Sequence, residues 1–205
     1  MHDRLEEFFA DCQSTVREFA QPADIALELA PMLHSLLGIH SEFMTSAHFA
    51  SSPDHYARNL IYASADGRLS LYSLVWSPGQ WTPVHDHGTW GLVGVVKGIL
   101  EERNFIRTDP REREDSGIIL RRGGHTLLGP GSVTTFVPNP DHIHRTGVPK
   151  NRETAVSLHL YGRNMNHYNV YDLELGRRYP IDLDEKNLRD ASGMHHPTSS
   201  HSETS

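Results

Sequence analysis

The sequence predicts a mainly β protein, an antiparallel sandwich or barrel, with helices at its N-terminus. From about residue 56 onward, short segments rich in Val, Ile, Leu, Thr and aromatic residues alternate with Gly, Pro, Asn and Asp, as is typical of strands and turns. The clearest segments are NLIYAS, LSLYSLVW, GLVGVVKGIL, GIILRR, SVTTFVP and TAVSLHLYG. No helical pattern separates them, so neighbouring strands are expected to run antiparallel.

Residues 1–45 have a helical period instead. In LEEFFADCQSTVREFA the apolar residues recur at spacings of three and four, which forms one amphipathic face; they are Leu5, Phe8, Phe9, Cys12 and Val16. A second helix is expected from about Pro22, and Gly38 is a plausible end for it. We expect both helices to lie on the outside of the sheet.

The chain of 205 residues suits a single folded domain. We expect that domain to span residues 46–185, with the helical segment 1–45 packed against it. The charged loop at 107–116 is predicted to be solvated. Residues 186–205 have the composition of a polar, disordered tail.

Composition excludes some classes of partner and location. The net charge of -7 gives no reason to expect a nucleic acid or an anionic membrane as partner. The lone cysteine, Cys12, rules out an internal disulfide and fits a reducing compartment. The N-terminus has no apolar signal segment, and no apolar run approaches the roughly 18 residues of a membrane span. We therefore expect a cytoplasmic protein that is a monomer or a weak homo-oligomer.

The segment WTPVHDHGTW places two histidines, His85 and His87, at alternate positions. On an extended strand alternate side chains share one face, so both imidazoles would project into the space that the sheet encloses. With a third histidine from elsewhere they would form an open facial metal site. Imidazole suits Fe, Zn, Cu and Ni, so the ligand type leaves the metal open.

A second alternating set is Ser157, His159 and Tyr161 in AVSLHLYG. One strand face would then carry a relay of hydrogen bonds. His159 between two hydroxyls could keep one tautomer and pass a proton, and Tyr161 could offer its O–H toward a metal. A plain polar ladder on a half-exposed strand is the alternative.

The surroundings of the His-x-His pair resemble the cupin family. The matching positions are Gly79, five residues, His85-Asp86-His87 and Gly98, followed by a looser second motif with Gly124, Pro130, Gly131 and the histidines 142 and 144. The resemblance implies a jelly-roll-like β-barrel with a metal in its mouth. The family's usual Glu is replaced by Gly91. Three neutral ligands would leave the site dicationic and favour an anionic thiolate as incoming ligand.

Three further segments resemble the cysteine dioxygenase family over roughly residues 50–165. They are DHYARNLIY, HIHRTG and AVSLHLYG. The resemblance implies Fe(II) held by His85, His87 and His144, with Ser157, His159 and Tyr161 as the catalytic triad. It also implies that Arg58 binds a substrate carboxylate, for which its planar fork is suited. Tyr56 is a candidate pocket wall.

His125 and His142 are the other two histidines between His85 and His159. His142 is the alternative third ligand, and Arg145 next to His144 matches the family pattern and favours His144. His125, in a GGHT turn, is expected to lie apart from the site.

The implied reaction is oxidation of a small carboxylate-bearing thiol by O2 to its sulfinic acid. Arg58 favours L-cysteine, whereas 3-mercaptopropionate and mercaptosuccinate are the alternatives, with Arg163 as a candidate for binding a second carboxylate. A different class of protein also fits the His-x-His pair, namely a metal-binding cupin sensor without turnover. A cupin isomerase or sugar-binding module would normally keep the Glu that Gly91 replaces.

Overall fold

The structure is a computed structural model that describes residues 2–138 and 142–182. Its helices are α1 (Asp3–Glu18), α2 (Pro22–Gly38), α3 (His40–Phe43) and the 3-10 helix η1 (Ser46–Phe49). Its strands are β1 (Ala57–Ala63), β2 (Ser70–Trp76), β3 (His85–Asp86), β4 (Gly91–Lys97), β5 (Leu100–Arg107), β6 (Leu120–Leu128), β7 (Val133–Phe136), β8 (Ile143–Gly147), β9 (Ala155–Tyr161), β10 (His167–Asp172) and β11 (Arg177–Asp182).

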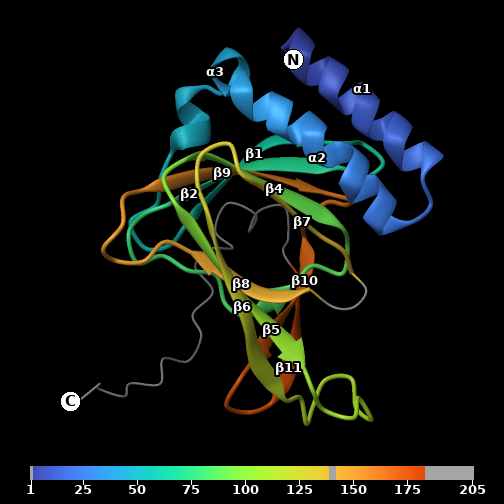
Figure 1. Cartoon of the computed structure of the whole chain (residues 1–205), viewed down its shortest axis with the longest axis vertical. Coiled ribbons are helices and arrows are strands. Elements are labelled where there is room, and N and C mark those ends of the chain that lie inside the picture. The colour runs from blue at the N-terminus through green and yellow to red at the C-terminus, as the bar shows by residue number, and fades with distance from the viewer. Residues whose placement is uncertain (1, 139–141, 183–205) are drawn as a thin grey trace.

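The strands form two antiparallel sheets. One has the order β1-β2-β9-β4-β7 and the other β11-β10-β3-β8-β5-β6. Both sheets contribute side chains to one internal pocket, so they face each other as the two walls of a barrel. The β5–β6 and β10–β11 hairpins extend away from the helical end of the molecule (Figure 1). The expected cupin-like antiparallel barrel with N-terminal helices outside it is confirmed.

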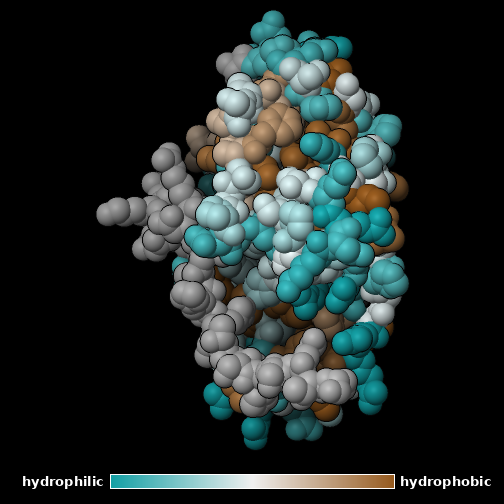
Figure 2. Space-filling view, turned by 90° about the vertical axis from the view of Figure 1, so that its left-hand side faces the viewer, coloured by the Kyte–Doolittle hydropathy of each residue, from teal (hydrophilic) through white to brown (hydrophobic). Residues whose placement is uncertain are grey.

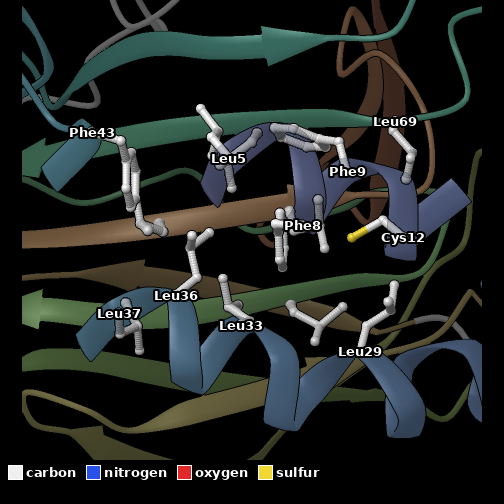
Figure 3. Close-up of a cluster of buried hydrophobic side chains, with 14 of the residues drawn as sticks. Leu5, Phe8, Phe9, Cys12, Leu29, Leu33, Leu36, Leu37, Phe43 and Leu69 are labelled. Carbon is white, nitrogen blue, oxygen red and sulfur yellow. The ribbon is translucent and has the colours of Figure 1, made fainter. Parts of the chain in front are cut away.

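The N-terminal helices cover the outer face of the five-stranded sheet (Figure 1). Their facing side chains form a buried apolar cluster (Figure 3). Leu71, Leu92 and Leu158 of the sheet belong to the same cluster. Helix α2 begins with Pro22 in its first turn and ends at Gly38, as predicted. Burying these side chains removes apolar surface from water, which is the main driving force for docking the helices.

Strand β9 shows how one strand serves both sides of this sheet. Val156, Leu158 and Leu160 belong to the outer cluster under the helices, while the residues between them face the barrel interior. All seven residues of β9 are buried for this reason. The helices therefore explain the apolar residues at alternate positions of β9, because these residues are covered by the helices. The polar residues between them face the pocket.

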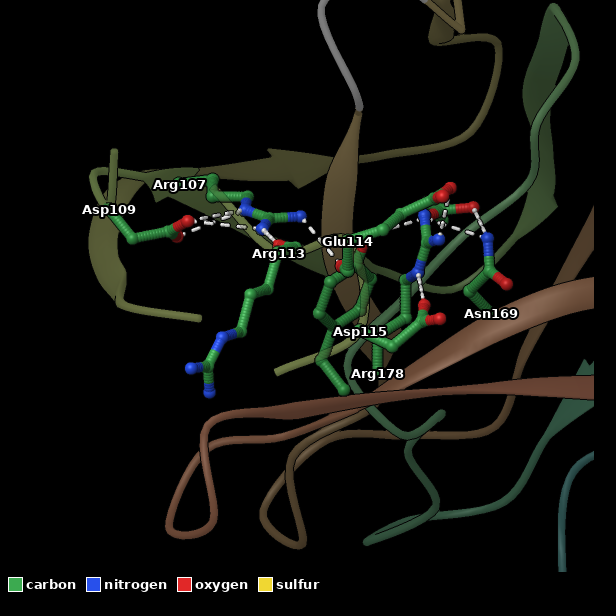
Figure 4. Close-up of polar contacts among 9 residues, drawn as sticks. Arg107, Asp109, Arg113, Glu114, Asp115, Asn169 and Arg178 are labelled. Carbon is green, nitrogen blue, oxygen red and sulfur yellow. Dashed lines mark hydrogen bonds and ion pairs between the residues drawn. The ribbon is translucent and has the colours of Figure 1, made fainter. Parts of the chain in front are cut away.

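The loop between β5 and β6 is folded around ion pairs, so the expected solvated charge run is wrong for part of it. The side chains of Arg107 and Asp109 are each only 4% exposed, with the guanidinium Nε 2.9 Å from Asp109 Oδ1 (Figure 4). Arg107 also donates to the carbonyl oxygens of Arg113 and Glu114. Arg178 of β11 pairs with Glu114 and Asp115, which joins the loop to the β10–β11 hairpin.

Hydrophilic residues cover much of the side of the molecule seen in Figure 2, and hydrophobic ones lie in scattered groups between them. Within the described residues, no helix is both long and apolar enough to cross a membrane. The tail predicted over residues 186–205, like the last residues of the predicted domain, lies outside the described part of the chain.

Candidate metal centre

A pocket opens between the two sheets, and residues from both line it. The lining residues come from β1 and the segment before it, from β2, β3, β8, β9 and β10, and from the segments around these strands. The lining residues are Tyr56, Arg58, Leu74, Trp76, Thr82, His85, His87, His144, Thr146, His159, Tyr161, Met165 and Tyr168. Most of the residues that the sequence suggested for catalysis, substrate binding or metal binding line this pocket. Of the other two, Ser157 hydrogen-bonds to the lining residue His159, and Arg163 lies outside the lining.

The three predicted metal ligands lie together and are buried. His85 belongs to the short strand β3 and pairs in register with His144 of β8, while His87 follows β3. The Nε2 atoms of His85 and His87 are 3.2 Å apart. A potential ligand nitrogen from each of the three rings lies within 4.8 Å of the others. The structure thus brings the third histidine to the His-x-His pair through strand pairing.

The ring nitrogens fit a metal ion at this position. His85 Nδ1 lies 3.0 Å from the carbonyl oxygen of Pro83, so Nδ1 carries the proton and Nε2 presents a lone pair to the pocket. His144 Nε2 is buried without a hydrogen-bond partner. Two nitrogens bound about 2.1 Å from one ion at a right angle would lie ~3.0 Å apart, close to the separation of the two Nε2 atoms. A shared cation accounts for both features.

Burial keeps these rings neutral. Desolvation lowers the pKa of His85 and of His87 well below the ordinary value, and neighbouring histidines lower both further. The pKa of His144 is lowered as well, chiefly by burial. Neutral imidazole is the form that binds metals.

A buried carboxylate that the sequence did not point out, Glu102 of β5, lies behind His144. Its Oε2 is 3.2 Å from His144 Nδ1, and its Oε1 is 3.6 Å from His142 Nε2. Burial raises the pKa of Glu102, but hydrogen bonds from the two histidines outweigh it and hold the pKa below its usual range. His142 is 3.2 Å from His144 Nδ1 and does not line the pocket, so it is placed behind the third ligand.

Ser157, His159 and Tyr161 form a hydrogen-bonded chain on β9. Ser157 Oγ is 2.9 Å from His159 Nε2, and His159 Nδ1 is 3.1 Å from the Tyr161 hydroxyl. Burial lowers the pKa of His159 to about 3, so the ring is neutral. Burial raises the pKa of Tyr161, which keeps its phenol protonated. The Tyr161 ring lies 5.3 Å from that of His87, so the chain ends beside the metal ligands.

Arg58 and Tyr56 both line the pocket, as predicted. The Arg58 guanidinium donates to the carbonyl oxygen of Met165 and lies 4.8 Å above the Tyr72 ring. Tyr56 stacks on Trp76 with ring centroids 4.6 Å apart. These contacts hold a cation in the wall near the three histidines.

Arg163 and His125 both lie outside the lining of this pocket. Arg163 does not line the pocket, and its guanidinium donates to the carbonyl oxygen of His167. His125 does lie apart from the site, but on the exposed strand β6 and not in a turn.

Phe136 of β7 occupies the place next to Gly91 on β4. A Cβ atom at Gly91 would lie 2.3 Å from Cζ of Phe136, a distance that real Cβ atoms do not adopt. The Phe136 ring stacks on His87 at 4.4 Å and on His142 at 5.2 Å. The Phe136 ring therefore lies where a side chain at position 91 would begin, and it packs against His87, a contact that the sequence did not reveal.

The fold and this site define a cupin-type protein with a buried cluster of three histidines that could hold a metal ion. The sequence matches the cysteine dioxygenase type I family over residues 5–174, and the chain belongs to that family. Cysteine dioxygenase type 1 of Rattus norvegicus is 25% identical over 129 residues, which cover 62% of this chain and 61% of that protein's length. The Danio rerio protein of the same name is 25% identical over 179 residues, 86% of this chain and 85% of its own.

Two solved structures show weaker similarity to the chain. A conserved protein with a double-stranded beta-helix domain from Klebsiella pneumoniae has a TM-score of 0.45 at 14% identity, over 63% of this chain and 91% of its own. A cupin-like protein from Thermotoga maritima has a TM-score of 0.39 at 16% identity, over 71% of this chain and 93% of its own.

Proposed function

We propose that the protein is an Fe(II)-dependent thiol dioxygenase that oxidises a small carboxylate-bearing thiol, foremost L-cysteine, to its sulfinic acid. The observation that carries this proposal is that one pocket contains a neutral three-histidine centre, a guanidinium at Arg58 and the protonated phenol of Tyr161. Membership of the cysteine dioxygenase type I family supports it. The reaction balances without a reductant, because the thiol supplies the electrons and both oxygen atoms enter the product.

The metal would be held by His85, His87 and His144. A bound Fe(II) would supply open coordination positions and the redox chemistry that O2 requires. Among the described residues, no Asp or Glu lines the pocket, and the three rings are neutral, so an anionic thiolate would be the ligand that offsets the charge of the site.

Arg58 would bind the substrate carboxylate. Its guanidinium is fixed by the Met165 carbonyl and the Tyr72 ring, so little side-chain freedom remains to be lost when a substrate binds. A fixed carboxylate holds the sulfur beside the metal and lowers the entropic cost of reaction. Tyr161 would donate its hydroxyl proton to a ligand in the pocket, and the protonated state that burial enforces makes this possible.

The wall favours a monocarboxylate over mercaptosuccinate. Among the described residues that line the pocket, Arg58 is the one arginine or lysine, and Arg163, the candidate for a second carboxylate, lies outside that lining. Cysteine and 3-mercaptopropionate each carry one carboxylate, so both match one guanidinium. L-cysteine stays the first choice because the family resemblance, with an arginine at position 58, favours it.

A substrate panel tests the proposal. The purified protein is loaded anaerobically with Fe(II) and given cysteine, 3-mercaptopropionate or mercaptosuccinate, while O2 uptake and sulfinate are followed by an oxygen electrode and mass spectrometry. We expect uptake with cysteine at one O2 per sulfinate. Zn-loaded protein is the control, since Zn²⁺ has no redox chemistry. If none of the thiols supports O2 uptake, the proposal is refuted and a metal-binding sensor remains as the explanation.

A further inference from the structure

A second group of metal-binding side chains lies behind the pocket wall. It consists of Glu102, His142 and His144, and one ligand atom from each lies within 4.8 Å of the others. Glu102 belongs to β5, whereas the two histidines come from β8 and the residue before it. Neither Glu102 nor His142 lines the pocket. We call this group the outer cluster, and the group of His85, His87 and His144 the inner cluster.

The separations within the outer cluster match those between ligands on one tetrahedral ion. His144 Nδ1 lies 3.2 Å from Glu102 Oε2 and 3.2 Å from His142 Nε2. His142 Nε2 lies 3.6 Å from Glu102 Oε1. Ligand atoms bound about 2.1 Å from a tetrahedral ion lie ~3.4 Å apart. Two imidazoles and a carboxylate are also a common ligand set for Zn²⁺, with the fourth position left open.

Hydrogen bonds account for this cluster less completely than an ion does. A neutral imidazole carries one proton, so a proton on His144 Nδ1 can be donated to Glu102 or to His142 but not fully to both. The 3.6 Å between His142 and Glu102 is long for a hydrogen bond. One cation among the three ligand atoms would contact all of them together, and the carboxylate would offset part of its charge.

His142 makes the outer cluster accessible from solvent. Its side chain is 23% exposed, whereas those of Glu102 and His144 are 5% and 3% exposed. The His142 ring stacks on Phe136, which fixes its orientation, and both rings line a second, smaller cavity. An ion can therefore reach the outer cluster without passing through the substrate pocket.

The two clusters share His144 but use different nitrogens of its ring. The inner cluster uses Nε2, which is buried without a hydrogen-bond partner, and the outer cluster uses Nδ1. A neutral imidazole has a lone pair on one nitrogen and a proton on the other. When Nδ1 binds an ion, the proton moves to Nε2, where an ion in the inner cluster would need the lone pair. A neutral His144 therefore binds one ion at a time.

We propose that Glu102, His142 and His144 form a second site for a divalent cation of the Zn²⁺ type, and that an ion bound there removes His144 from the inner cluster. The carboxylate favours a dication in the outer cluster, and Zn²⁺ binds nitrogen and oxygen ligands more tightly than Fe²⁺ does. Excess Zn²⁺ would then inhibit the protein. The inhibition rests on the proposed dioxygenase function, whereas binding of the ion does not.

Zinc binding by a variant without the inner cluster is the first test. His85→Gln removes one inner ligand and keeps all three outer ones, so isothermal titration with Zn²⁺ should still show one ion per chain. Adding His142→Gln should lower the affinity at least about tenfold, because loss of a ligand costs no less than loss of a residue that orients one. Adding His125→Gln, at an exposed position on β6, should leave the affinity unchanged.

Two outcomes of the titration would overturn the proposal. One is a folded His85→Gln variant that binds no Zn²⁺, and the other is equal affinity with and without His142. If His85→Gln does not fold, His87→Gln removes a different inner ligand and takes its place in the same titrations.

A spectrum of the histidine nitrogens locates the ion directly. His85→Gln protein labelled with 15N in histidine is loaded with diamagnetic Zn²⁺, and the long-range 15N–1H spectrum shows which nitrogen of His144 carries the proton; His144→Gln assigns the signals. We expect a protonated Nε2 and a metal-bound Nδ1. A protonated Nδ1 with a metal-bound Nε2 would place the ion in the remainder of the inner cluster and contradict the proposal.

Inhibition supplies an independent readout. Zn²⁺ is added to Fe(II)-loaded wild type and His142→Gln, and each activity is expressed relative to the same protein without Zn²⁺. His142→Gln should need at least about tenfold more Zn²⁺ for half inhibition. Equal inhibition of the two proteins would refute a regulatory role for the outer cluster. If wild type oxidises no thiol, the dioxygenase function fails, and the titration and the spectrum still decide whether the outer cluster binds an ion.

Discussion

Glu102 Oε2 lies 3.2 Å from His144 Nδ1, and this contact decides which nitrogen of His144 faces the pocket. A histidine whose Nδ1–H donates to a carboxylate presents the lone pair of Nε2, and that arrangement also raises the basicity of a metal ligand. The unpartnered Nε2 of His144 lies on the opposite side of the ring. Glu102 therefore orients the third ligand without touching the metal position.

Replacing Glu102 by Gln should weaken metal binding. The amide keeps the shape of the side chain but loses the charge, so metal affinity should fall about 10–100-fold. Isothermal titration of the metal-free protein with Zn²⁺ or Fe(II) measures this. Glu101→Gln is the control, because Glu101 is its neighbour on β5 and pairs with Arg103 on the other face. Equal affinities for the Glu102 variant and wild type would contradict this role.

Acid should destabilise the metal-free protein through its buried histidines. Burial lowers the pKa of His85, His87, His144 and His159 in the folded state, the last to about 3, whereas an unfolded histidine titrates near 6.5. The unfolded state therefore binds more protons below pH ~6.5, and stability falls as pH falls. Each such group contributes up to about 1.4 kcal/mol per pH unit between its two pKa values.

Urea unfolding of the metal-free protein at pH 7, 6 and 5 measures this dependence. The free energy of unfolding should drop from pH 6 to pH 5, and the drop should shrink in His159→Gln, which removes one of the four rings. His125→Gln, in an exposed position on β6, is the control and should keep the wild-type slope. A flat profile in wild type would mean that the rings are not buried as the structure has them.

A side chain at position 91 should destabilise the barrel. Because a Cβ there would overlap Phe136, Gly91→Ala should lower the free energy of unfolding by about 1–3 kcal/mol. Gly124→Ala is the matched control, since nothing lies within 4 Å of its added Cβ. Combining Gly91→Ala with Phe136→Leu should recover part of the loss. Equal stability of the two alanine variants would show that Phe136 has room to move.

Arg58 should determine affinity for the carboxylate. Arg58→Gln removes a charged donor, which is worth about 1.5–3 kcal/mol, so KM for a carboxylate-bearing thiol should rise on the order of 10–100-fold. Cysteamine, which lacks the carboxylate, should be affected far less. Arg68→Gln alters an exposed arginine in the β1–β2 turn and is the control. An equal effect of Arg58→Gln on both thiols would place Arg58 away from the carboxylate.

The sequence revealed those parts of the site that lie on single strands. Alternation places His85 near His87 and aligns Ser157 with His159, because side chains two apart share a strand face. The antiparallel barrel followed from the same alternation and from the absence of helices between strands. The resemblance to a known family added His144 and Arg58, which no local pattern indicates.

The residues that the sequence did not reveal meet the site through strand pairing. Glu102 reaches His144 because β5 pairs with β8, with Glu102 opposite Thr146 and Asn104 opposite His144. Phe136 meets Gly91 through the pairing of β7 with β4, and Trp76 meets Ser157 across β2 and β9. The sequence held one local indication of Glu102: it lies two residues after Leu100, so the two side chains share the buried face of β5. Register between distant strands is set by the whole barrel, so spacing along the chain could not supply these contacts.

The most direct measurement of the central claim is the origin of the product oxygens. Fe(II)-loaded protein is given cysteine under 18O2 in ordinary water, and the sulfinate is analysed by mass spectrometry beside the His144→Ala variant. We predict cysteine sulfinic acid that carries two labelled oxygens in wild type and loss of product in the variant, which lacks one of the three ligands. Sulfinate with oxygen from water, or equal product from the variant, would contradict a dioxygenase built on the three histidines.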